Sequence, residues 1–108
     1  MCYTNDMKIV SSVSGALIRL TAERVGHIIA RHPEMIEEEQ RILDTVESPD
    51  LIQKGDAGTL IALKHYSRTP LTEKYCAVVY RELNGDGFIL TAYFTSKPAV
   101  GRRITWQR

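Results

Sequence analysis

A tight-turn sequence between two long β-prone runs, Asn84-Gly85-Asp86-Gly87, constrains the fold more than any other feature. Asn-Gly and Asp-Gly pairs readily adopt the positive φ angles of two-residue hairpin turns, so such a sequence reverses a strand. The run 75–83 before the turn is apolar and β-branched through Tyr80, which is typical of a central strand. We therefore expect 75–83 and 88–95 to form an antiparallel hairpin inside a sheet.

The second strand of this hairpin has two kinds of side chain in alternation, which predicts two different sheet faces. The set expected to face the core is Phe88, Leu90, Ala92 and Phe94. The other set carries hydroxyl and phenol groups and is followed in register by Lys97; it consists of Ile89, Thr91, Tyr93 and Thr95.

The first half of the chain predicts two helices that meet at a proline. Thr21 is a suitable N-cap for a helix over 22–31, and a residue before proline avoids helical geometry, so this helix should stop near His32. Pro33 suits the first position of a second helix that runs to about residue 47. His32 then lies at the elbow, at the electropositive end of the second helix.

These elements predict one α+β domain that covers residues 1–108. The remaining β-prone runs are a small hairpin or edge strand within 8–20 and a strand over 59–66, with a loop over 67–74. We expect N-terminal helices packed on one face of a roughly four-stranded antiparallel sheet, with the other face open. The histidines would then reach a site on the open face only around its rim.

Charge is distributed unevenly along the chain. Residues 1–50 contain five basic and nine acidic residues, whereas 51–108 contain nine basic and four acidic ones. Two explanations stay open: the basic half meets a polyanion, or opposite charges attract the helices to the sheet. The polar start and the lack of a long apolar run predict a cytoplasmic protein with no membrane contact. Cys2 and Cys76 are expected to be free thiols.

Basic and imidazole side chains are concentrated around the elbow. Arg24, His27 and Arg31 share one helix face, whereas His32 continues the apolar stripe, so the two histidines are expected to point in different directions. Their spacing across a broken helix is not a standard metal-ligand pair, and we expect no metal and no cofactor.

Histidines, cations and hydroxyls suit cleavage of RNA by its own 2′-hydroxyl group. The nucleophile belongs to the substrate, so the protein supplies a base, an acid and positive charge for the phosphorane. A histidine that titrates near neutral pH can serve as either acid or base.

Two segments in the expected order resemble a known family. The stretch 27–35, which contains Arg31-His32-Pro33-Glu34-Met35, and the stretch 87–93 resemble the phage-associated branch of the barnase, EndoU, colicin E5/D and RelE-like (BECR fold) nuclease superfamily. The resemblance covers about residues 20–106. It implies a metal-independent ribonuclease, with tRNA or mRNA as substrate, on a four-stranded antiparallel sheet.

The resemblance also suggests roles for individual residues. His32 would act as general acid or base, with His27 or Arg31 assisting. The basic strand positions would be Lys64 and Arg68, and phosphate would be contacted by Arg68 and Lys97. The last strand would position the substrate through Thr91, Tyr93 and Thr95.

Two other functions stay open at this stage. One is a RelE-like or BrnT-like toxin module that acts on ribosome-bound mRNA and is held by a protein inhibitor or antitoxin. The other is a non-catalytic, protein-binding derivative of the fold. Replacement of His32 separates the catalytic functions from the non-catalytic one. Loss of a catalytic histidine abolishes toxicity or cleavage without unfolding the domain, whereas loss of a structural histidine lowers stability.

Overall fold

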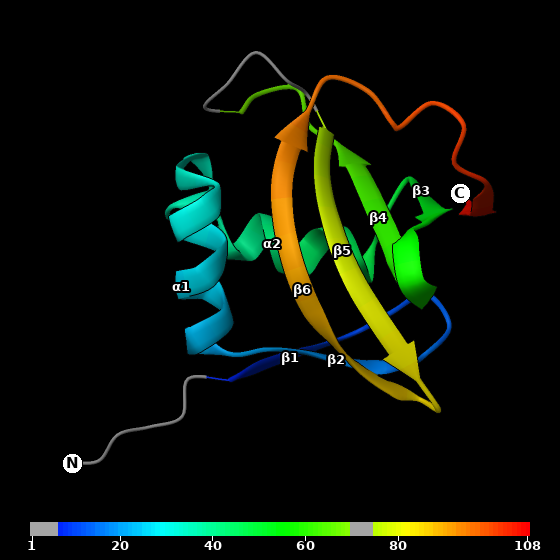
Figure 1. Cartoon of the computed structure of the whole chain (residues 1–108), viewed down its shortest axis with the longest axis horizontal. Coiled ribbons are helices and arrows are strands. Elements are labelled where there is room, and N and C mark those ends of the chain that lie inside the picture. The colour runs from blue at the N-terminus through cyan, green and yellow to red at the C-terminus, as the bar shows by residue number, and fades with distance from the viewer. Residues whose placement is uncertain (1–6, 70–74) are drawn as a thin grey trace.

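The computed structural model describes residues 7–69 and 75–108, and within them seven strands form one mixed sheet (Figure 1). The strand order is β1-β2-β6-β5-β4-β3-β7. The strands are β1 (Lys8–Ser11), β2 (Leu17–Leu20), β3 (Leu51–Lys54), β4 (Leu60–His65), β5 (Tyr75–Leu83), β6 (Asp86–Thr95) and β7 (Ile104–Gln107). Neighbours are antiparallel except β2 and β6, which are parallel. The expected four-stranded antiparallel sheet is therefore wrong in both strand number and strand direction.

The central hairpin is confirmed. In the β5–β6 register Leu83 pairs with Asp86, so the connection is the two residues Asn84 and Gly85. Their φ angles are 49° and 84°, as a hairpin turn that follows the twist of the strands requires. The short hairpin expected within 8–20 is also confirmed, as β1 and β2.

The parallel pairing of β2 with β6 was not predicted from the sequence. Three residues of each strand take part, Leu17 to Arg19 with Asp86 to Phe88. Gly87 permits β6 to approach both neighbours closely, because a Cβ at this position would overlap the Arg81 carbonyl oxygen of β5 and lie 2.9 Å from Ile18 Cδ1 of β2. Strands β3 and β7, at the other side of the sheet, were also missed. The β2–β6 and β3–β7 pairings join segments that are far apart in sequence.

The helices do not lie together on one sheet face, which corrects the expected arrangement. Helix α2 (Glu39–Glu47) crosses behind the sheet, whereas α1 (Ala22–Arg31) stands beside β6 (Figure 1). Because β2 pairs with β6 only as far as Phe88, the rest of that edge of β6 is left without a strand neighbour in the described sheet. Helix α1 follows this edge.

Helix α1 has the predicted bounds, but the second predicted helix is broken. The Thr21 side chain accepts a hydrogen bond from the Arg24 N–H at 3.1 Å, and the helix ends one residue before His32. A short 3-10 helix, η1 (Pro33–Met35), follows. Glu37 then has a φ of 62°, which a right-handed helix does not contain, and α2 begins only at Glu39. A second 3-10 turn, η2 (Asp56–Gly58), precedes β4.

The two sheet faces differ in their cover. The face toward α2 belongs to the main core, which includes Ile42 and Val46 of α2 and Cys76, Val78 and Tyr80 of β5. The opposite face has a smaller apolar cluster made of Leu51, Ile61, Leu63 and Ala77. We call this second face the helix-free face.

Two sequence expectations fall partly outside the described residues: Cys2, and residues 70–74 of the loop expected over 67–74. Within the described ranges, no helix has both the length and the apolar character needed to cross a membrane.

Candidate functional site

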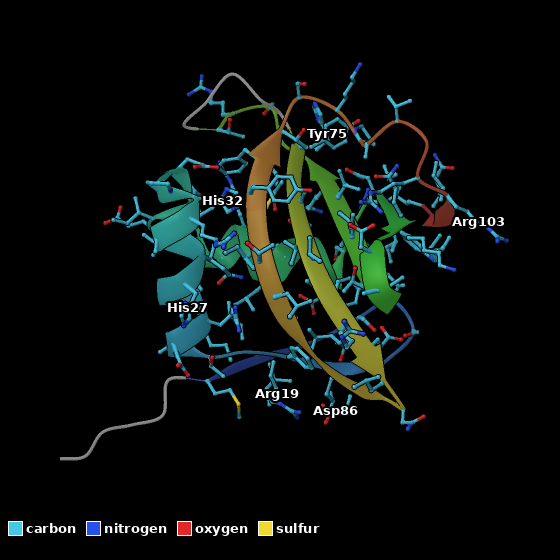
Figure 2. All side chains as sticks on the ribbon, viewed as in Figure 1. Arg19, His27, His32, Tyr75, Asp86 and Arg103 are labelled. Atoms are coloured by element: carbon cyan, nitrogen blue, oxygen red, sulfur yellow. The ribbon has the colours of Figure 1, made fainter. Side chains whose placement is uncertain are left out.

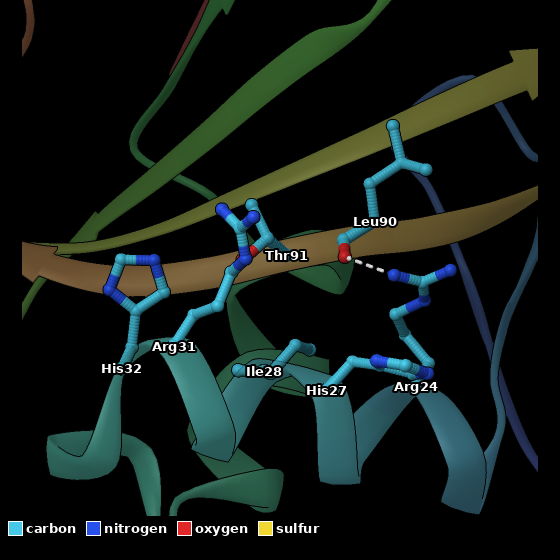
Figure 3. Close-up of a pocket in the computed structure, with 7 residues that line it drawn as sticks. All are labelled: Arg24, His27, Ile28, Arg31, His32, Leu90 and Thr91. Carbon is cyan, nitrogen blue, oxygen red and sulfur yellow. Dashed lines mark hydrogen bonds between the residues drawn. The ribbon is translucent and has the colours of Figure 1, made fainter.

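A groove between α1 and β6 brings together residues from both halves of the chain (Figure 3). Its volume is about 390 Å³. The residues that line it are Arg24, His27, Ile28, Arg31, His32, Leu90 and Thr91. Five come from α1 or its C-cap and two from β6, so the groove exists only because α1 lies along the edge of β6.

A β-bulge forms the strand side of the groove. Val79 pairs with Thr91 and Tyr80 with Ile89, so Leu90 is an extra residue without a partner on β5. Arg24 Nη1 donates a hydrogen bond to the Leu90 carbonyl oxygen at 3.4 Å (Figure 3). Bulges redirect side chains and are frequent beside functional sites.

The bulge also corrects the face assignment made from simple alternation. Ile89, expected on the open face, is 1% exposed in the main core, whereas Phe88, expected in the core, is 37% exposed. Beyond the bulge the prediction is correct: Ala92 and Phe94 face the main core, and Tyr93 packs on the helix-free face. One inserted residue reverses the faces of the residues before it relative to those after it. The alternation of residue types in the sequence does not show where such a residue lies.

His27 and His32 both border this groove, although their spacing predicted that they point in different directions. The expectation assumed that His32 continues the helix. As the C-cap it has φ −132° and ψ 79°, so helical spacing no longer sets its direction. Its ring lies 5.5 Å from the Tyr93 ring, centroid to centroid, which joins the groove to the helix-free face.

Each histidine of the groove has a carboxylate nearby. His32 Nδ1 lies 3.8 Å from Glu34 Oε2, and His27 Nε2 lies 3.9 Å from Glu23 Oε2. The His32 side chain is 33% exposed and that of His27 is 61% exposed. His32 is therefore the more enclosed of the two, and its Nε2 is the ring nitrogen not directed at Glu34.

Thr91 contributes a hydroxyl group that lacks a partner. Its Oγ1 atom is buried and has no hydrogen bond within the described part of the chain. A buried polar atom without a partner costs roughly 1–3 kcal/mol, so such atoms in native proteins call for an explanation. Thr91 also lines the groove, so this hydroxyl lies beneath the groove surface, close to where a ligand would bind.

Five predicted site residues do not line the groove: Tyr93, on the helix-free face beside it, and Lys64, Arg68, Thr95 and Lys97. Lys64 is on β4, two strands away from the groove, and its Nζ donates to the Ser48 carbonyl oxygen at 2.9 Å. Arg68 is exposed beyond the end of β4. Thr95 Oγ1 donates to the Lys97 carbonyl oxygen at 3.2 Å, and the Lys97 side chain is exposed.

Sequence reasoning missed Arg24 as a site residue. The sequence did indicate Arg24, because it shares a helix face with His27 and Arg31. Its hydrogen bond across the groove, however, is made to the carbonyl oxygen of Leu90 in the bulge, which the sequence did not predict. The groove therefore holds two guanidinium groups, two imidazoles and a hydroxyl. Among residues 7–69 and 75–108, no three histidines, cysteines or carboxylates are grouped so that they could hold a metal ion.

No model of a known protein family matches the sequence, and no match was found among curated proteins or solved structures.

Proposed function

We propose that the protein is a metal-independent ribonuclease, with the groove between α1 and β6 as its active site. The observation that carries this proposal is the meeting of His27, His32, Arg31 and Thr91 around one cavity. These groups match the needs of RNA cleavage by the substrate's own 2′-hydroxyl: proton transfer and stabilisation of a dianionic phosphorane.

His32 is the principal acid–base group in this proposal. It is partly enclosed between Tyr93 and Glu34, which limits its orientations, and the ring nitrogen not directed at Glu34, Nε2, would face the substrate. His27, on the same groove but more exposed, transfers the second proton. Attack needs a base at the 2′-hydroxyl and an acid at the leaving 5′-oxygen, and two imidazoles supply both.

Arg24, Arg31 and Thr91 bind the reacting phosphate. Guanidinium groups donate several hydrogen bonds to phosphate oxygens in a fixed planar geometry. Arg24 is already held by the Leu90 carbonyl oxygen, which reduces the entropy lost on binding. The partnerless Thr91 hydroxyl donates to a non-bridging oxygen.

The family resemblance supports the same activity. The segments that resemble the phage-associated nuclease branch, 27–35 and 87–93, supply all seven groove residues except Arg24. The proposal rests on these local segments and on the groove, and does not include the four-stranded fold that the resemblance implied.

The test is incubation of the purified protein with total RNA in EDTA, beside the variant His32→Ala. We expect fragments that end in 2′,3′-cyclic phosphate, and a loss of cleavage of about 100- to 10,000-fold in His32→Ala. The melting temperature of the variant should stay within a few degrees of the original. Products that end in 3′-hydroxyl, a strict metal requirement, or full activity of His32→Ala would each contradict the proposal.

A second arm of this test uses mRNA bound to ribosomes. Cleavage that appears only with ribosomes, and still requires His32, would favour the toxin-module function over a ribonuclease that acts on free RNA.

A further inference from the structure

The helix-free face next to the groove has an apolar floor with aromatic side chains on it. Leu51, Ile61, Leu63 and Ala77 form the floor, and Tyr75, Val79 and Tyr93 pack against it while remaining partly exposed. No helix of the described chain lies over this surface in Figure 1. Partly exposed tyrosines on a sheet are suited to contact with flat ligands.

Four aromatic rings extend from the groove across this face. His32 contacts Tyr93 of β6, with ring centroids 5.5 Å apart. Tyr93 pairs with Ala77, and Tyr75 pairs with Thr95, so the two tyrosines are diagonal neighbours on adjacent strands. Tyr75 in turn pairs with His65 of β4, and their rings are 5.2 Å apart in an edge-to-face arrangement. We call Tyr93, Tyr75 and His65 the aromatic row.

Exposed cations lie at the same end of the sheet as the aromatic row. β4 and β6 both end there, because each runs antiparallel to β5, which begins at Tyr75. Arg68 follows the end of β4 and Lys97 follows the end of β6, and both are exposed. Figure 2 shows Tyr75 at this end of β5, with His32 on the side of α1. Positive charge is thus present in the groove, in Arg31, and beyond the ends of the two strands that flank β5, in Arg68 and Lys97.

We infer that the aromatic row binds the bases of single-stranded RNA next to the phosphate held in the groove. Tyr93 and Tyr75 stack on successive bases, His65 supports Tyr75 from its edge, and Arg68 and Lys97 contact the backbone beyond. Aromatic stacking combined with nearby cations is characteristic of single-strand binding, because bases in a duplex do not expose their faces. This inference rests on the proposed function and adds its substrate class.

The test measures binding of a fluorescein-labelled oligodeoxythymidine of about twelve nucleotides by anisotropy. DNA lacks the 2′-hydroxyl, so it occupies the site without being cleaved. We expect tighter binding of the single strand than of its duplex with oligodeoxyadenosine at the same salt concentration. Tyr75→Ala should weaken single-strand binding roughly tenfold to 100-fold.

Two further variants guard against a folding defect. Tyr93→Phe keeps the ring and should retain binding, whereas Tyr93→Leu should lose it to the same degree as Tyr75→Ala. Phe88→Leu is the matched control, because Phe88 is an exposed aromatic residue of the same strand, at its opposite end. It should bind like the original protein.

The outcomes separate this inference from the proposed function. If Tyr75→Ala binds with unchanged affinity, or if duplex and single strand bind equally well, the aromatic row does not bind RNA bases. This conclusion would hold even if the protein cleaves RNA in EDTA. Binding that depends on Tyr75 in a protein that cleaves no RNA supports the row and contradicts the ribonuclease.

Discussion

The two faces of the same sheet differ in how far they are covered, and β5 shows the difference residue by residue. Cys76, Val78 and Tyr80 point toward α2 and are 0% exposed. Tyr75 and Val79 point the other way and stay half-buried. Burial of apolar area stabilises the fold mainly on the first face. The second face keeps aromatic and polar side chains accessible beside the groove, where packing does not restrict residue choice. Stability and the proposed activity should therefore respond to different substitutions.

The largest effect on stability is expected for Ile42→Ala, on the covered face. Ile42 is 1% exposed in the main core, and its truncation leaves a cavity that costs about 2–5 kcal/mol. Denaturant unfolding should show this loss, while RNA cleavage by the remaining folded protein keeps its rate. A loss of unfolding free energy below 1 kcal/mol would contradict the tight packing of α2 on the covered face of the sheet.

Alkaline pH tests how well the covered face excludes water. Burial raises the pKa of the Cys76 thiol to about 11 from 9.0. A raised pKa gives stability that is complete below the unfolded pKa and is lost as pH rises from about 9 to 11. The free energy of unfolding should fall by roughly 2–3 kcal/mol more in the original protein than in Cys76→Ala over this range. Identical pH profiles would contradict the burial of this thiol.

Arg31→Ala tests the groove against a matched arginine. Loss of a charge-assisted phosphate contact should lower kcat/KM for RNA about 10- to 100-fold. Arg103→Ala is the control, since Arg103 is exposed near β7 on the far side of the sheet (Figure 2). It should change kcat/KM by less than about twofold, because one distant surface charge contributes little. Similar losses in both variants would indicate general charge attraction and no specific role for the groove.

The smallest effect is expected for Thr91→Val, where stability and activity should change in opposite directions. Valine has nearly the same shape and removes the partnerless hydroxyl, so the free energy of unfolding should stay the same or rise. Cleavage of RNA should fall about 2- to 10-fold, because one neutral hydrogen bond to the phosphate is lost. Loss of stability would show that the hydroxyl has a structural partner, and unchanged cleavage would remove Thr91 from the active site.

Local signals in the sequence were enough to predict several of the elements. The turn at Asn84 and Gly85 fixes the central hairpin through backbone angles, and Thr21 with Pro33 fixes both ends of α1. The sequence also identified His27, Arg31, His32 and Thr91, four of the seven groove residues.

The arrangement of these elements, in contrast, follows from contacts that form only in the folded chain. The parallel β2–β6 pairing, the edge position of α1 and the bulge at Leu90 depend on contacts between residues far apart in the chain. The alternation of residue types along a strand and their spacing along a helix carry no information about such contacts. For this reason the sequence supplied the chemical groups of the groove, and the folded chain decided which of them meet.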